Sequence, residues 1–118
     1  MHLVFYHNPK CSKSREALSL LNKRGIEPEI VYYLKTPPTA RDLAAIIKKL
    51  GIQPKELVRF KEELLREIEI GPGSPLNDSE WIDLMIRNPV LIERPILFSD
   101  QRAVIGRPPE KVLELIKN

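Results

Sequence analysis

Residues 3–34 read LVFYHNPKCSKSREALSLLNKRGIEPEIVYYL, and this stretch decides the fold. Its first four residues form a short, β-prone apolar run that is typical of a buried strand, and Asn8-Pro9 interrupts that run. From residue 14 the apolar side chains fall on one face of a helix, which ends at Lys23, Arg24 and Gly25. Residues 29–34 then predict a second strand. The stretch therefore predicts a βαβ unit with the helix as its crossover.

The middle of the chain is predicted to be helical. Residues 39–42 have the pattern of a capping box, and the apolar residues after them share one face of a helix. Pro54 suits the first turn of a short helix, and residues 61–68 predict another helical piece. Asn77 has the spacing of a helix cap, and the helix that it starts is expected to end before Pro89.

The last part of the chain predicts two strands and a helix. Residues 95–98 and 103–105 flank a turn-like segment and predict an antiparallel hairpin. Pro108-Pro109 supplies the start of a final helix, whose expected core face is Val112, Leu113 and Ile116. The complete order matches an α/β, thioredoxin-like fold, in which a helical insert separates the βαβ unit from a C-terminal ββα unit. Because 118 residues are too few for two domains of ordinary size, we expect a single domain over residues 1–118.

Composition and charge exclude several classes of protein. The net charge is +3 and the pI is near 9.1, but basic residues alternate with acidic ones, so we expect no nucleic-acid partner. No stretch approaches the ~20 apolar residues that span a bilayer, and the first residues lack the pattern of a signal peptide. We therefore expect a cytoplasmic protein with no membrane partner. One cysteine and two histidines lack the spacing of a zinc site, and no glycine-rich phosphate loop is present, so we expect no bound metal or cofactor.

Cys11 is the only cysteine and the best candidate for chemistry. It precedes the predicted helix, where unpaired N–H groups and the helix dipole stabilise a thiolate. The same N–H groups suit an anionic substrate, so residues 7–14 are a candidate oxyanion cradle. The alternative is an inert buried thiol, the commoner fate of a free cysteine, but the polar neighbours argue against it. With one cysteine, any disulfide must involve another molecule.

Other side chains are candidates to act with this thiol. His7 could hold a proton or a positive charge near the sulfur, or it could only hydrogen-bond its own loop. The Ser14 hydroxyl could donate to the sulfur. Arg59, Arg94 and Arg107 lie beside apolar residues or proline, and a guanidinium donates paired hydrogen bonds to a tetrahedral oxyanion. Each could equally be a surface arginine whose stem covers apolar neighbours. Only convergence on the thiol would decide between these interpretations.

Several segments resemble one known family. Residues 6–15, YHNPKCSKSR, resemble the opening active-site segment of the ArsC family, the glutaredoxin-linked arsenate reductases. Later segments resemble that family in order and approximate spacing, namely residues 33–38, 57–59, 91–96 and 106–108. The resemblance implies a thioredoxin-like fold with a helical insert, Cys11 as the nucleophile and a cis peptide bond at Pro95.

The resemblance also implies roles for the remaining candidates and a reaction. Arg59, Arg94 and Arg107 would bind the oxyanion, while His7 and Ser14 would support the thiolate. Arsenate would be attacked by the thiolate, glutathione would reduce the adduct, and arsenite would leave. Glutaredoxin would then resolve the mixed disulfide by thiol exchange. Glutathione is thus expected as a co-substrate, no cofactor is expected to be bound, and the protein is expected to be a monomer.

Two other functions are open alternatives at this point. The first is a glutathione-dependent thiol oxidoreductase that uses the same loop on glutathionylated proteins and ignores arsenate. The second is a regulator similar to Spx, which shares the fold but binds RNA polymerase. That branch often carries Cys-x-x-Cys, whereas this chain has Cys11-Ser12-Lys13-Ser14. The sequence therefore favours the enzyme over the regulator.

Overall fold

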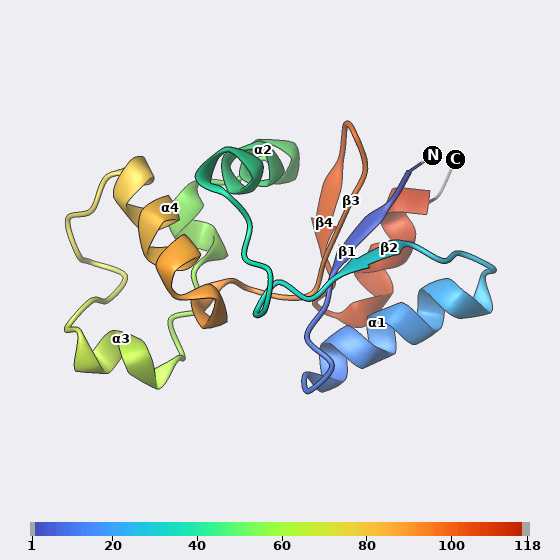
Figure 1. Cartoon of the computed structure of the whole chain (residues 1–118), viewed down its shortest axis with the longest axis horizontal. Coiled ribbons are helices and arrows are strands. Elements are labelled where there is room, and N and C mark those ends of the chain that lie inside the picture. The colour runs from blue at the N-terminus through green and yellow to red at the C-terminus, as the bar shows by residue number, and fades with distance from the viewer. Residues whose placement is uncertain (1, 117–118) are drawn as a thin grey trace. The chain divides into compact units, whose positions relative to one another are not determined.

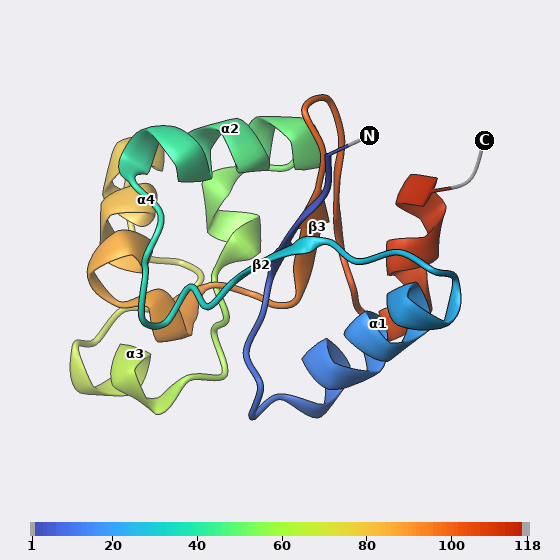
Figure 2. The same cartoon turned by 45° about the vertical axis from the view of Figure 1, so that its right-hand side comes forward.

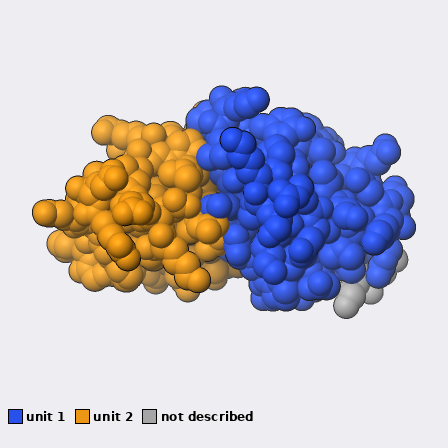
Figure 3. Space-filling view, turned by 90° about the horizontal axis from the view of Figure 1, so that it is seen from below, with its two compact units in different colours: residues 1–37, 94–118 blue, residues 38–93 orange. Residues whose placement is uncertain are grey.

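The computed structural model describes residues 2–116, and their contacts divide the chain into two compact units (Figures 1 and 3). Unit 1 comprises Met1–Pro37 and Arg94–Asn118, and unit 2 comprises Pro38–Glu93. Unit 2 is therefore the helical insert that was predicted between the βαβ and ββα parts. The prediction of a single domain over residues 1–118 stays a prediction.

Unit 1 is built on a four-stranded sheet with the order β2-β1-β3-β4. Strand β1 (Val4–Tyr6) is followed by helix α1 (Ser12–Lys23) and strand β2 (Glu29–Val31), which pairs parallel to β1. The predicted βαβ unit is confirmed. Its second strand is shorter than predicted, because the N–H groups of Lys35 and Thr36 both donate to the Tyr32 carbonyl at 2.9 Å and turn the chain away.

The C-terminal hairpin completes the sheet of unit 1 (Figure 2). Strand β3 (Ile96–Phe98) pairs antiparallel to both β1 and strand β4 (Ala103–Ile105). The pairing of Ile96 with Ile105 sets the register of the hairpin. The predicted hairpin is therefore confirmed, and it lies beside β1, the first strand of the βαβ unit.

The core of unit 1 lies between the sheet and two helices. Phe5 and Leu97 pair directly across β1 and β3, and both contribute to the buried cluster that α1 covers through Ala17 and Leu21. The second covering helix is η3 (Pro109–Ile116), which is a 3₁₀ helix. Its buried cluster residues are Val112 and Leu115, while Leu113 and Ile116 are only partly buried. The predicted helix is present, but its core face follows the three-residue period of a 3₁₀ helix.

Unit 2 consists of short helices with well-formed ends. They are α2 (Ala40–Leu50), η1 (Pro54–Leu57), α3 (Glu63–Glu67), α4 (Asp78–Arg87) and η2 (Pro89–Leu91). The Thr39 side chain accepts from the N–H of Asp42, and Asn77 forms a reciprocal capping box with Glu80. The predicted starts of α2 and α4 are therefore confirmed. Within residues 2–116, none of the helices has both the length and the apolar character needed to cross a membrane.

A tight contact after β4 gives a test of the packing in unit 1. Gly106 is buried, and a Cβ there would lie 2.8 Å from Cγ of Pro95 and 3.0 Å from Cγ1 of Val112. We predict that Gly106→Ala lowers the free energy of unfolding by about 1–3 kcal/mol, because the added methyl group overpacks this contact. Urea denaturation measures the change. Gly71→Ala is the matched control, since no heavy atom lies within 4 Å of its added Cβ. Equal losses in the two variants would contradict the prediction.

Candidate active site

Cys11 lies where the sequence predicted it, at the N-terminus of α1. It is the N-cap residue, with φ −92° and ψ 122°, and its carbonyl accepts from the N–H of Arg15 at 3.1 Å. The preceding loop is tight, because the Cys11 N–H donates to the Asn8 carbonyl at 2.9 Å and the Lys10 N–H donates to Asn8 Oδ1 at 3.0 Å. The loop therefore holds the half-buried thiol at the first turn of the helix.

The surroundings of Cys11 favour its charged form. Burial raises the pKa of the thiol, but the backbone N–H groups of Ser14 and Lys13 and the guanidinium of Arg94 act in the opposite direction. The pKa of Cys11 is therefore lowered overall. Several donors thus stabilise the thiolate together. A thiol of this kind is a nucleophile near neutral pH.

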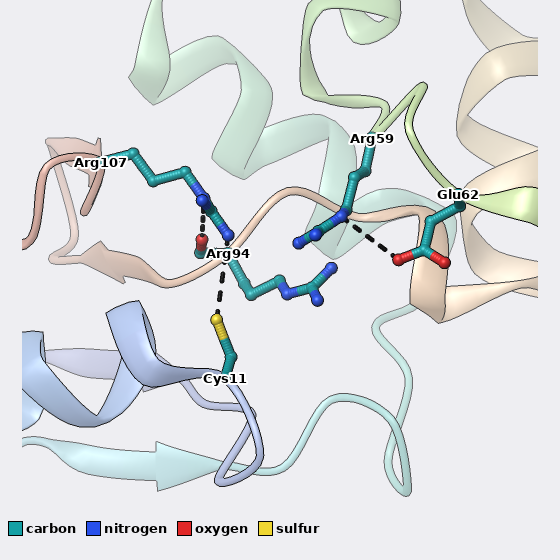
Figure 4. Close-up of polar contacts among 5 residues, drawn as sticks. All are labelled: Cys11, Arg59, Glu62, Arg94 and Arg107. Carbon is teal, nitrogen blue, oxygen red and sulfur yellow. Dashed lines mark hydrogen bonds and ion pairs between the residues drawn. The ribbon is translucent and has the colours of Figure 1, made fainter.

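Two arginines of unit 1 meet at this sulfur (Figure 4). Arg107 Nη2 lies 3.8 Å from Cys11 Sγ, and Arg107 Nε donates to the Arg94 carbonyl at 2.7 Å. The Arg94 guanidinium also interacts with the sulfur by hydrogen bonding and charge. The Arg94-Pro95 peptide bond is cis, as the family resemblance implied, and so is Arg107-Pro108, which was not predicted. Cys11 therefore lies beside two guanidinium groups.

The sheet topology explains why these residues converge. The Cys11 loop follows β1, Arg94 lies two residues before β3, and Arg107 lies two residues after β4. Because β3 is antiparallel to both of its neighbours, the end of β1, the start of β3 and the end of β4 meet at one edge of the sheet. The Gly106 N–H donates to the Pro95 carbonyl at 2.8 Å and closes the base of the hairpin there.

His7 and Ser14 form a buried polar pair under the loop. His7 Nδ1 and Ser14 Oγ are 2.6 Å apart, and Ser14 Oγ also accepts from the Asn8 N–H at 3.1 Å. Burial, and then the charge of Arg15, lower the pKa of His7, so the neutral imidazole predominates at neutral pH. Of the two roles considered for His7, the geometry thus favours a positioning role over the supply of a positive charge. His7 holds Ser14, and the N–H of Ser14 acts on the Cys11 sulfur.

Arg59 lies in unit 2 and has a carboxylate partner that the sequence analysis missed. Its N–H donates to the Leu91 carbonyl at 2.7 Å, and its Nε lies 3.2 Å from Glu62 Oε1 (Figure 4). Among residues 2–116, Arg59 Nη1 is buried with no hydrogen-bond partner. The three-residue spacing of Arg59 and Glu62 was the available signal for their pairing. The convergence of Arg59 on Cys11 stays a prediction.

The chemistry available in unit 1 is that of an activated thiol with anion-binding groups. A guanidinium presents paired donors to a tetrahedral oxyanion and offsets the repulsion between that oxyanion and a thiolate. Within the described part of the chain, no group of three or more His, Cys, Asp or Glu residues is placed to hold a metal ion. The arrangement around Cys11 therefore suits nucleophilic attack on a small oxyanion.

Comparisons with known proteins agree on one family. The sequence profile of the ArsC family matches residues 6–115. The Escherichia coli K12 protein named "Uncharacterized protein YfgD" is 49% identical over 112 residues, which are 94% of this chain and 93% of that protein. The arsenate reductase of Haemophilus influenzae is 42% identical over 117 residues, which are 98% of this chain and all of that protein. The solved arsenate reductase from Vibrio cholerae has a TM-score of 0.91 at 45% identity, with 97% of each chain covered.

The acidity of Cys11 gives a test of this site. We predict that Arg94→Met raises the pKa of Cys11, because the variant loses a hydrogen bond and a positive charge that favour the thiolate. The rate of alkylation by iodoacetamide, measured against pH, reports this pKa. At a pH near the wild-type pKa the variant should therefore react more slowly. Arg24→Met, at the opposite end of α1, is the control and should leave the profile in place. An unchanged profile in Arg94→Met would rule out this role.

Proposed function

The chain belongs to the ArsC family, and from that premise we propose that it is an arsenate reductase in which the Cys11 thiolate attacks arsenate. The observation that carries the proposal is the contact of Arg107 Nη2 with Cys11 Sγ at 3.8 Å, beside an Arg94 that helps to lower the pKa of the thiol. The identity of the substrate is inferred from the arsenate reductases among its relatives, which it matches over nearly their full length.

In the proposed mechanism arsenate lies against the guanidinium groups of Arg94 and Arg107. Their charges offset the repulsion between the anionic substrate and the thiolate, and their donors hold the arsenate oxygens during attack. The sulfur forms a bond to arsenic, one arsenic–oxygen bond breaks, and that oxygen takes up protons from solvent and leaves as water. Arg59 adds a third guanidinium to the same substrate in this proposal, with Glu62 fixing its Nε edge.

Reduction then requires a second thiol. Converting As(V) to As(III) takes two electrons, and we propose that the Cys11 sulfur supplies one and the glutathione sulfur the other. The two sulfurs are then joined as a mixed disulfide, and arsenite leaves. The chain has one cysteine, so it cannot resolve this disulfide itself. Glutaredoxin is proposed to do so by thiol exchange, which returns the Cys11 thiolate. The proposed reaction needs no bound cofactor. We also propose that the enzyme is a monomer and lies in the cytoplasm.

The first experiment couples arsenate reduction to NADPH oxidation through glutathione, glutathione reductase and glutaredoxin. We expect turnover by the wild type and none by Cys11→Ser, because the serine hydroxyl is a far weaker nucleophile. Arg107→Leu should lower kcat/KM for arsenate by about 100-fold or more, the scale for removal of an oxyanion donor. A wild type without turnover would refute the proposed substrate, and activity in Cys11→Ser would refute the proposed nucleophile.

One observation also favours the thiol oxidoreductase alternative. A half-buried thiol with a lowered pKa suits thiol–disulfide exchange whether or not arsenate binds. Arg59 separates the two functions, because it is proposed to bind only arsenate, whereas the groups that lower the pKa of Cys11 are Arg94 and the N–H groups of Ser14 and Lys13. For an arsenate reductase, we predict that Arg59→Leu loses most arsenate turnover but keeps its rate of deglutathionylation of a glutathionylated peptide. Unchanged arsenate turnover in Arg59→Leu would contradict its proposed role.

A further inference from the structure

A pocket of about 320 Å³ lies beside the Cys11 loop, wholly within unit 1. The pocket is lined by residues 7–10 of the loop and by Tyr32, Leu34 and Lys35, which follow β2. Its volume is at the lower end of the range of about 300–1,000 Å³ that is typical of small-molecule sites. The pocket is therefore of a size to hold a short peptide or a metabolite.

The lining of this pocket combines apolar surface with positive charge. Tyr32 and Leu34 are large apolar residues that are 46% and 42% exposed, and Pro9 lies opposite them. Lys10 and Lys35 are the charged lining residues, and no carboxylate is among the described residues that line the pocket. Such a lining favours an anionic ligand that also carries apolar atoms.

The loop side of the pocket is already ordered. His7 and Asn8 are buried and fixed by Ser14, whose Oγ lies 2.6 Å from His7 Nδ1 and accepts from the Asn8 N–H. The ring of Tyr32 lies 5.9 Å from the ring of His7, measured between centroids. A ligand would therefore meet a preorganised surface, which reduces the entropic cost of binding.

The pocket also adjoins the nucleophile along the chain. Lys10 lines it and is the residue directly before Cys11, so their Cα atoms are separated by one peptide unit, about 3.8 Å. An extended tripeptide spans about 10 Å. A tripeptide bound in this pocket is therefore long enough to extend past Lys10 to the residue that carries the nucleophile.

We propose that this pocket binds glutathione, with its carboxylates near Lys10 and Lys35 and its aliphatic carbon atoms against Tyr32 and Leu34. The inference rests on the proposed function, which makes glutathione the reducing co-substrate. Glutathione carries two carboxylates and one ammonium group, and so matches the charge of the lining. The larger pocket of unit 1, about 620 Å³, is lined by Glu27 and Glu29, which would repel the same ligand.

A thiol exchange that needs no arsenate tests this site directly. The Cys11 thiolate attacks one sulfur of glutathione disulfide, a new S–S bond forms, the old S–S bond breaks, and a glutathione thiolate leaves. Cys11 is oxidised and the departing half of the disulfide is reduced. Mass spectrometry follows the rate at which the protein gains one glutathione. The neutral 2-hydroxyethyl disulfide reacts with the same sulfur but lacks the carboxylates, so it reports the reactivity of the thiol alone.

We predict that Lys35→Glu slows the reaction with glutathione disulfide about fivefold or more, while the rate with the neutral disulfide changes less than about twofold. Lys35→Arg should keep the wild-type rates, since it retains the charge. Lys111→Glu makes the same change of charge on η3, outside the pocket, and should leave both rates within about twofold. Tyr32→Ala, at a half-exposed side chain, should slow only the glutathione reaction.

Three results would overturn the proposal. If Lys35→Glu slowed the reactions with both disulfides equally, the substitution would have changed the reactivity of the thiol and not the binding of glutathione. Equal slowing of glutathione disulfide by Lys111→Glu would show a general effect of net charge. An unchanged glutathione rate, with slower release of the mixed disulfide by glutaredoxin, would make the pocket a docking surface for that protein. A wild type that prefers glutathione disulfide but does not reduce arsenate would refute the proposed function alone.

Discussion

The negative charge on the Cys11 sulfur is the constraint on which the rest of the site depends. Burial of the thiol opposes that charge, and the donors of the first turn of α1 and of Arg94 offset the cost. The donors come from two different parts of the fold, because α1 follows β1 and Arg94 precedes β3. The sheet of unit 1 is thus a frame that brings a helix N-terminus and the base of a hairpin to one sulfur.

The parts of this frame that were predictable from the sequence have local signals. The βαβ unit follows from a change between two hydrophobic periods within residues 3–34, and the hairpin follows from two short apolar runs around a turn. Thr39 and Asn77 mark helix starts because their side chains bond an N–H only three residues later. Cys11 was placed correctly for the same reason, since its position depends only on where the adjacent helix begins.

The contacts that complete the site have no local signal. Arg107 lies 96 residues from Cys11 and 13 residues from Arg94, and its contacts with both depend on the register of β3 and β4. The partnership of His7 with Ser14 spans a loop whose path the spacing does not fix. The 3₁₀ form of η3 shifted the buried face to Leu115, because Pro109 and the residues after it adopt a three-residue period that an α-helical pattern does not describe.

Arg107 makes two different contacts with one rigid guanidinium group. Its Nε fixes the backbone carbonyl of Arg94, while its Nη2 faces the Cys11 sulfur. A lysine at this position would keep the charge but could not make both contacts in a fixed geometry. The Cys11 sulfur and the hairpin base therefore share one planar side chain as a partner, and residues that share a partner are energetically coupled. A change that moves the hairpin base also moves the guanidinium that faces Cys11, and energetic effects measured separately at the two places do not add.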